Sequence, residues 1–443
     1  MSFVDDFNAT NSLDVRVKLY GETMLDQAAG IFNLVEMRVI GFNFATGNGV
    51  ERNTAKAAEW WRRAAEAGDS CSMFNLAVCY FQGDGVERNI AEAIYWWRQA
   101  AETGDSNAMN NLGCSYKNGD GVERNLEEAV YWFRQSARIG NYEAMYNLGA
   151  CYEYGSGVGR NLAKAFRLYR RAARENFPKA MLKLGLFYRH GLAVERNPEE
   201  AVKWYRRAAE AGELGATFNL GVCYKNGVGV ERNPEEAVKW YRRAAEAGNQ
   251  YAMFNLGYCY EAGDGVDQNS EEAFKWFRRA AEAGNPCAMF SLGVCYGTGD
   301  GVERNPEEAV KWYRRAAEAG NQYAMFNLGY CYETGDGVDQ NLEEAFNWYR
   351  RGAEAGDARA MNNLGYCYET GEGVDQNLEE AVKWYRRALE TGLSFAALSL
   401  GECYENGRGC ERNLEEAIKL YRQAAAGGVE EAKAALERLG EEL

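Results

Sequence analysis

Apolar and polar residues along this chain follow the spacing of two helices, and the pair recurs every 36 residues. The second helix of each pair has the clearer pattern. In residues 233–248 the apolar Ala237, Tyr241 and Ala244 recur at helical spacing, which predicts one buried face. Asn233 begins this helix as its N-cap, and Gly248 ends it. Asparagine holds the N-cap position in all eleven repeats, and glutamate follows three residues later in nine, which predicts a capping box.

The first helix of each pair is predicted over residues such as 250–261. Ala252, Leu256 and Tyr260 lie four residues apart, so they form a stripe that we expect to be buried. Gly257 falls in mid-helix, where glycine costs about 1 kcal/mol relative to alanine. Glycine nevertheless stands there in ten of the eleven repeats, with Ala77 as the exception. We therefore expect an aromatic ring of the second helix to lie over this glycine.

A Gly-x-Gly-Val turn follows the first helix and keeps the same register from Val50 to Cys410 without an insertion or deletion. Its glycines suit turn positions with positive φ, and its valine is expected to fill the gap between helices. Ala193 in place of the second glycine and Cys410 in place of valine are mild departures. A repeat of this length predicts a solenoid, in which each unit packs only on its neighbours.

The array divides the chain into three parts. Residues 33–428 hold eleven tandem repeats of 36 residues, numbered 1 to 11 from the N-terminus. Residues 1–32 are expected to form a tail with a degenerate capping half-repeat over 13–30. Residues 429–443 are expected to form a C-terminal capping helix, because Arg438 stands where a repeat has an apolar or aromatic residue.

The recurring residues A-x-x-x-L-G-x-x-Y-x-x-G-x-G-V-x-x-N-x-x-x-A-x-x-W-Y-x-x-A-A-x-x-G resemble the Sel-one-like repeat, a 36-residue relative of the tetratricopeptide repeat. This resemblance covers about nine-tenths of the chain and implies an all-α, right-handed α–α superhelix. It also implies an adaptor that holds protein partners, as in protein degradation, chitin synthase regulation and bacterial host interaction. Some cysteine-rich bacterial members are linked to penicillin binding. Those members have a cysteine near the end of the second helix, where this chain has Ala245 and its equivalents, so that activity is not expected here.

Composition narrows the class of protein. The hydrophobic share of 47% supplies a core and argues against disorder. A net charge of −15 argues against general affinity for nucleic acid or anionic membranes. No apolar run approaches the roughly 18–20 residues of a membrane span, and the N-terminus has acids where a signal peptide has basic residues. We therefore expect a cytoplasmic protein with no direct membrane insertion.

Twelve cysteines support a reducing compartment. Eight of them share one repeat position: Cys79, Cys151, Cys223, Cys259, Cys295, Cys331, Cys367 and Cys403. Neighbouring helices lie about 10 Å apart, which is too far for a disulfide along this column. Only Cys403 and Cys410 are placed so that they could meet. The chain has no C-x-x-C pair and a single histidine, His190, so we expect neither a metal site nor a cofactor.

The candidate binding residues lie on the first helices, which line the concave face in tetratricopeptide arrays. One column offers amide donors and acceptors that suit a peptide backbone or carboxylate, and its members are Asn75, Asn111, Asn147, Asn219, Asn255, Asn327 and Asn363. Two aromatic columns suit a recognition surface, and they include Phe218, Phe254, Phe290, Phe326, Tyr258, Tyr330 and Tyr366. Each column also has a structural interpretation, as polar caps for the asparagines and as core for the aromatic residues.

Charge along these first helices changes sign. Repeats 3 to 6 present basic side chains, namely Lys117, Lys179, Lys183, Arg189, His190 and Lys225. Repeats 7 to 11 present glutamates, namely Glu261, Glu333, Glu369 and Glu405. One hypothesis is a groove with a basic centre for an acidic segment and an acidic, aromatic C-terminal half for a basic one. The alternative is scattered surface charge.

These observations favour a non-enzymatic scaffold that binds a protein or peptide. His190 has no nucleophile placed beside it by a known motif, and the Glu-Glu pairs sit in first helical turns, where they complement the helix dipole. One alternative is a regulatory subunit that activates a membrane enzyme or a degradation complex. A second, disfavoured alternative is a hydrolase-like, β-lactam-binding activity. The partner and the oligomeric state do not follow from the sequence.

Overall fold

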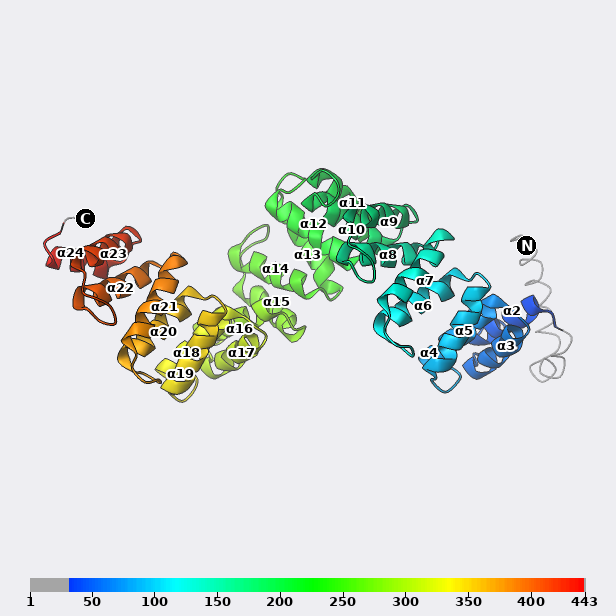
Figure 1. Cartoon of the computed structure of the whole chain (residues 1–443), viewed down its shortest axis with the longest axis horizontal. Helices are drawn as coiled ribbons and strands as arrows, with labels where there is room; N and C mark the ends of the chain where they lie inside the picture. Colours follow the sequence, from blue (N-terminus) through cyan, green and yellow to red (C-terminus); the bar gives the residue numbers. More distant parts are fainter. Residues whose placement is uncertain (1–31, 442–443) are drawn as a thin grey trace. The chain divides into compact units, whose positions relative to one another are not determined.

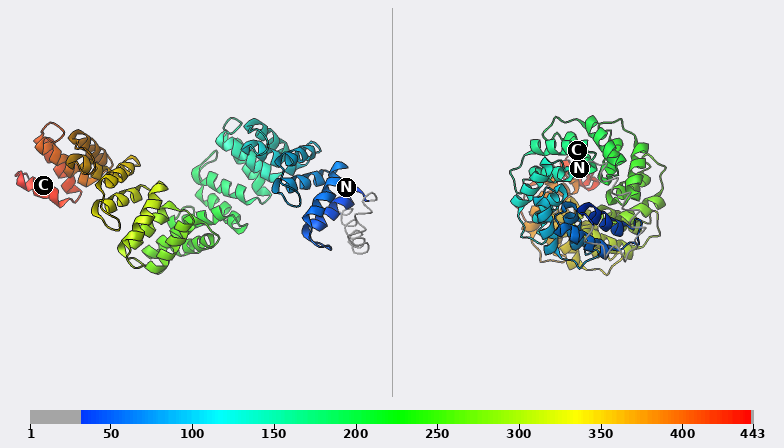
Figure 2. Two further views of the ribbon diagram at one scale, coloured as in Figure 1. Left: turned by 90° about the horizontal axis from the view of Figure 1, so that it is seen from below. Right: turned by 90° about the vertical axis from the view of Figure 1, so that its right-hand side faces the viewer.

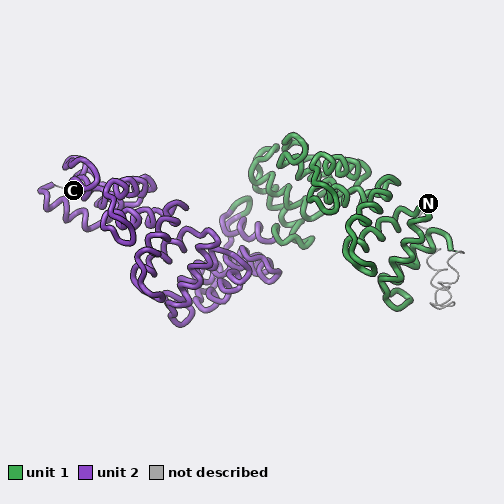
Figure 3. The backbone as a smooth tube through the Cα atoms, turned by 60° about the horizontal axis from the view of Figure 1, so that its bottom comes forward, with its two compact units in different colours: residues 1–216, 228–230 green, residues 217–227, 231–443 purple. Residues whose placement is uncertain are grey.

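The computed structural model describes residues 32–441, within which every regular element is an α-helix. The helices form an all-α solenoid of eleven pairs, so the expected fold class is confirmed (Figure 1). Two compact units are distinguished: residues 1–216 with 228–230, called the N-terminal unit, and residues 217–227 with 231–443, called the C-terminal unit (Figure 3). Within residues 32–441 no helix has the length and apolar character needed to cross a bilayer.

The first helices of the repeats are α2 (Leu34–Thr46), α4 (Ser70–Gln82), α6 (Ser106–Asn118), α8 (Tyr142–Tyr154), α10 (Pro178–His190), α12 (Leu214–Asn226), α14 (Gln250–Ala262), α16 (Pro286–Thr298), α18 (Gln322–Thr334), α20 (Ala358–Thr370) and α22 (Ser394–Asn406). The second helices are α3 (Thr54–Glu66), α5 (Ile90–Glu102), α7 (Leu126–Arg138), α9 (Leu162–Arg174), α11 (Pro198–Glu210), α13 (Pro234–Glu246), α15 (Ser270–Glu282), α17 (Pro306–Glu318), α19 (Leu342–Glu354), α21 (Leu378–Glu390) and α23 (Leu414–Ala426). From α2 to α11, and again from α13 to α24 (Glu430–Arg438), each helix packs on the one before it and the one after it (Figure 2).

The second helices begin as the sequence predicts, but their caps differ in one respect. The side chain of Asn233 accepts a hydrogen bond from the backbone N–H of Glu236 at 3.0 Å, and asparagine caps all eleven second helices in this way. The prediction of a capping box is wrong for this helix, because the carboxylate of Glu236 accepts a bond from Lys239 at 2.6 Å and not from the backbone of Asn233. The backbone N–H of Asn233 donates instead to the carbonyl of Tyr224, at 2.8 Å. This bond ties the start of each second helix to the end of the first helix.

The mid-helix glycines lie under aromatic rings, as expected. A Cβ atom at Gly257 would lie 2.7 Å from the ring of Phe277, closer than atoms of this kind approach each other. The turn glycines are equally constrained, since Gly265 has a φ of 80° and a Cβ there would lie 2.3 Å from the carbonyl of Pro234. Ala193 adopts the same left-handed conformation, with a φ of 57°. An aromatic ring therefore limits the mid-helix position to a small residue, and close approach of the next backbone does the same at the turn.

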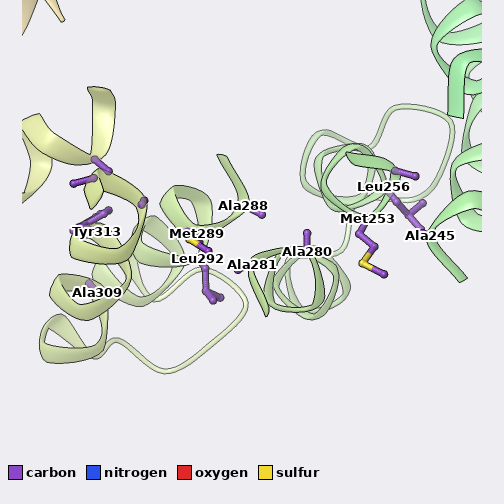
Figure 4. Close-up of a cluster of buried hydrophobic side chains, with 14 of the residues drawn as sticks. Ala245, Met253, Leu256, Ala280, Ala281, Ala288, Met289, Leu292, Ala309 and Tyr313 are labelled. Atoms are coloured by element: carbon purple, nitrogen blue, oxygen red, sulfur yellow. The ribbon is translucent and has the colours of Figure 1, made fainter. Parts of the chain in front are cut away.

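The core runs between the helices of successive repeats. In the C-terminal unit it is built largely from alanine, with Leu256 among the alanine side chains (Figure 4). Leu256 and Tyr241 are almost fully buried. Burying a leucine side chain contributes roughly 1.5–3 kcal/mol, and the small alanines let the helices approach closely. Tyr260 was predicted to be buried, but it is only half-buried, and its hydroxyl accepts a hydrogen bond from Arg242 at 2.7 Å. The turn valines, such as Val266, pack against the edge of this core.

The C-terminal end is closed by α24, whose Ala432 and Leu436 are buried on the last repeat. Arg438 bonds both carboxylate oxygens of Glu405, at 2.7 and 2.8 Å. The capping half-repeat expected over residues 13–30 lies outside the described residues.

Candidate partner-binding surface

The asparagine column lies half-buried on the first helices, and several of its members are held by other side chains. Asn147 donates to Asn110 at 3.0 Å, and Asn255 donates to the backbone carbonyl of Tyr251 at 2.8 Å. Asn327 and Asn363 hydrogen-bond the buried tyrosine hydroxyls of the preceding repeats. The side chains of the column therefore link repeats as well as facing outward.

The glutamate column has a structural role that the sequence did not indicate. Four glutamates accept a hydrogen bond from the buried tyrosine of their own repeat: Glu153 from Tyr169 at 2.5 Å, Glu333 from Tyr349, Glu369 from Tyr385 at 2.7 Å, and Glu405 from Tyr421 at 2.6 Å. Burial first, and then the carboxylate, raises the pKa of each of these tyrosines. The tyrosines therefore remain neutral donors.

Glu261 is the exception in this column. Its own repeat has Phe277 in place of the tyrosine, so no hydroxyl bonds the carboxylate, and Glu261 is exposed. Burial of part of the side chain, followed by repulsion from Asp300, raises the pKa of Glu261 above its ordinary value. Among the glutamates predicted as binding residues, Glu261 is thus the one facing solvent, whereas Glu333 is half-buried.

The basic residues of repeat 5 are placed differently from one another. Lys183 forms an ion pair with Glu153 at 3.0 Å and bonds the hydroxyl of Tyr154 at 3.0 Å. Its charge is therefore balanced within the N-terminal unit. Lys179 is exposed, whereas Arg189 is half-buried. The structure does not gather these three side chains into one cluster of free cations, because Lys183 is already paired.

The two aromatic columns differ in exposure. Phe254 is half-buried against Phe277, with ring centroids 5.8 Å apart. Phe326 packs on Tyr349 at 5.9 Å and lies 4.2 Å from the guanidinium of Arg359. In contrast, the tyrosines of the second column are exposed, Tyr258 to 46%, Tyr330 to 52% and Tyr366 to 45%. These three residues, all in the C-terminal unit, are called the tyrosine stripe below.

Two small pockets were missed by the reasoning from sequence. One, of about 160 Å³, is lined by Gly297, Pro306, Ala309, Tyr313, Asn327, Tyr330, Cys331 and Asp336. The other, of about 120 Å³, is lined by Ala45, Thr54, Ala57, Trp61, Asn75, Val78, Cys79, Gln82 and Asp84. Gly297 and Ala45 occupy the repeat position that holds the glutamate column elsewhere. The sequence therefore contained an indication of both pockets, namely a small residue at a position where most repeats have a long side chain.

The cysteine column lies on the same first helices. The cysteine column is buried, and burial raises the pKa of Cys79 to about 11 and that of Cys403 to about 12. Thiols with such pKa values are poor nucleophiles near neutral pH. Within residues 32–441, no group of three or more His, Cys, Asp or Glu side chains is placed to hold a metal ion.

Comparisons with known proteins agree with this architecture. The family model of the Sel1 repeat matches eleven segments, residues 38–69, 72–105, 106–141, 143–177, 178–213, 215–249, 250–285, 288–321, 322–357, 358–392 and 394–429. A protective antigen present in uropathogenic Escherichia coli strains, whose crystal structure displays an SLR fold, is similar with 33% identity and a TM-score of 0.74. That match covers 94% of this chain and 90% of the antigen. A Sel1 repeat protein from Oxalobacter formigenes is similar with 33% identity and a TM-score of 0.57, over 70% of this chain and 90% of that protein. A comparison with curated proteins finds no match.

Proposed function

The chain belongs to the Sel1 repeat family, and from that premise we propose that it is a non-enzymatic scaffold that binds a protein or peptide along its first helices. The observation that carries this proposal is the tyrosine stripe. Tyr258, Tyr330 and Tyr366 recur at the same repeat position and expose about half of each side chain. Exposed tyrosines supply large, rigid contact area with a polar tip, and such side chains dominate the energy of protein interfaces.

A duplicated block supports this proposal. Residues 229–261 are identical to residues 301–333, so Tyr258 and Tyr330 have the same local sequence. Tyr251 and Tyr323, two turns before them, are also exposed, to 54% and 49%. The C-terminal unit therefore presents two matching aromatic patches. Two matching patches suit a long partner segment or one with a repeated motif, because the second contact becomes intramolecular.

A matched pair of variants tests this proposal. The first replaces the stripe, with Tyr258→Ser, Tyr330→Ser and Tyr366→Ser. The control, Tyr95→Ser with Tyr131→Ser, removes exposed rings of similar size (53% and 47% exposed) from the second helices α5 and α7. Phe254 and Phe326 stay unchanged, because each packs on a ring of the second helix and its loss would weaken the fold. Equal circular dichroism and melting of both variants are the condition for comparing them.

The measurement is quantitative affinity capture from native lysate with wild type and both variants. We expect the stripe variant to lose partners that the second-helix control retains. If instead the control loses partners and the stripe variant keeps them, binding uses the second-helix side. That result would favour the alternative of a regulatory subunit that contacts its target through another surface.

A further inference from the structure

Gly297 leaves an opening beside the first helix of repeat 8, at a position where nine of the other ten repeats have a long side chain. The same position holds Phe81, Lys117, Glu153, Arg189, Lys225, Glu261, Glu333, Glu369 and Glu405. The pocket of about 160 Å³ beside Gly297 lies between α16, α17 and α18. Its polar groups are the hydroxyl of Tyr313, the amide of Asn327 and the carboxylate of Asp336, and the ring of Tyr330 forms one side.

Two repeats earlier, the same position shows which group can fill this space. Lys225 stands where repeat 8 has Gly297, and Tyr258 stands where repeat 9 has Tyr330. The ammonium nitrogen of Lys225 lies 4.4 Å from the ring centroid of Tyr258. An ammonium over an aromatic ring is attracted by the negative face of the π-system. Because Gly297 has no side chain, the ring of Tyr330 has no such cation from its own chain at this position.

Among the residues that line the pocket the charged one is Asp336, and Arg304 lies beside it, since its Nε donates to the carbonyl of Gly297 at 2.9 Å. Asp336 lines the pocket and is paired with Arg304 at 2.9 and 3.0 Å. On the neighbouring first helix, burial and then Glu261 and Asp300 raise the pKa of Cys295 to about 12. Burial and then Asp336 raise the pKa of Cys331, which lines the pocket, to about 11. Burial is the larger cause of both shifts, and the nearby carboxylates are the next.

We propose that the pocket beside Gly297 binds a primary ammonium group, namely a lysine side chain of a basic partner segment. The ammonium lies over the ring of Tyr330 and is attracted by the carboxylate of Asp336, while the hydroxyl of Tyr313 offers an oxygen acceptor. The identity of the occupant as a partner's side chain rests on the proposed scaffold function. The pocket's preference for ammonium rests only on the residues that line it.

A carboxylate is the competing occupant. In repeats 9, 10 and 11 a glutamate at this position accepts the tyrosine hydroxyl. A partner's carboxylate beside Gly297 would lie near the carboxylate of Asp336, however, and two like charges repel each other. Three small probes separate these chemistries: butylammonium, butyrate and butyramide have similar shapes and differ in charge.

The experiment is a titration of the full chain with each probe, followed by NMR of the backbone amide of Gly297 and the side-chain amide of Asn327. We expect a saturable shift with butylammonium that weakens as salt is added, because added ions screen the attraction. Butyrate and butyramide are expected to shift neither signal. Saturable binding of butyrate, or equal binding of all three probes, would overturn the proposal.

Two substitutions at one position supply the controls. Gly297→Lys places the chain's own ammonium where Lys225 stands in repeat 6, so butylammonium should bind at least about tenfold more weakly. Gly297→Ala adds a Cβ that meets only the Tyr313 hydroxyl at 3.5 Å and Ala309 at 3.8 Å, both ordinary contacts. Its affinity should fall by less than that of Gly297→Lys, because a methyl group carries no charge. Equal affinity in the lysine variant would show that the probe binds elsewhere.

The pocket beside Ala45 provides an internal control for the same titration. There Val78 stands in place of Tyr330, and Trp61, which has no hydroxyl, stands in place of Tyr313. We expect no saturable shift at Asn75, and equal shifts at Asn75 and Asn327 would contradict the role of the tyrosine ring. This titration does not depend on any partner. The titration therefore tests the ammonium site separately from the scaffold function, whereas capture by the stripe variant, which also lacks Tyr330, tests the scaffold function as a whole.

Discussion

Two glycines of one helix show how the contacts of a single position determine whether it can hold a side chain. Gly293 and Gly297 are four residues apart in α16, and both face Tyr313. A Cβ at Gly293 would lie 2.6 Å from the ring, whereas one at Gly297 would lie 3.5 Å from the hydroxyl oxygen. The sequence predicted the first glycine, because it recurs in ten repeats. The sequence did not predict the pocket beside Gly297, because residues of the next repeat form part of its lining.

The same substitution at these two positions should therefore have opposite effects. Gly293→Ala forces the Tyr313 ring aside and should destabilise the fold by about 1–3 kcal/mol. Gly297→Ala removes backbone freedom from the unfolded chain without a clash, and should stabilise it by up to about 1 kcal/mol. Urea unfolding followed by far-ultraviolet circular dichroism measures both changes. A Gly293→Ala variant as stable as wild type would show that the ring does not hold this glycine in place.

At the scale of the element, periodicity predicted the helices and their asparagine caps but not the contacts between side chains of successive repeats. Lys183 was expected to face a partner, yet it lies against Glu153 of the preceding repeat. Glu369 was expected in an acidic groove, yet it accepts the hydroxyl of Tyr385. The sequence shows which positions share a helix face. Partner choice within that face depends on the distance and twist between neighbouring helices, which the repeat pattern does not contain.

The terminal helix α24 offers a test of one such contact. Arg438 bonds Glu405 and, as the leading cause, lowers the pKa of that carboxyl below its ordinary value. Because the folded pKa is depressed, the stabilisation is present above the unfolded pKa and is lost as pH falls through the folded value. Arg438→Met should speed hydrogen exchange of the α24 amides at pH 7 by about fivefold, because the helix opens more often without this contact.

The difference between the Arg438→Met variant and wild type should disappear in acid, once Glu405 is protonated in both proteins. Lys433→Met is the matched control, since Lys433 pairs only with Glu430 of its own helix, at 2.7 Å. Exchange that is faster by the same factor at every pH would assign the effect to lost packing of the arginine stem rather than to the ion pair.

For the whole molecule, the family and the number of repeats follow from the sequence, because each repeat carries the same signals. The duplicated block makes this modularity testable. Helices α13 and α17 have identical sequences, and so do the segments that follow them up to Glu261 and Glu333. Excision of residues 249–320 would therefore join α13 to α18 through an interface that already occurs in the native chain.

We expect the variant without residues 249–320 to fold, with helical content per residue unchanged and a slightly lower melting midpoint, because stability in such arrays sums over repeats and their interfaces. Binding should suffer more than folding. The excision removes Tyr258 and the Gly297 pocket and leaves one of the two matching aromatic patches, so the gain from simultaneous contacts is lost. Titration of a captured partner should show a fall in affinity larger than that caused by Tyr258→Ser alone. If the excised chain and the Tyr258→Ser variant bind equally well, the partner contacts one patch at a time, and the duplication does not contribute to recognition.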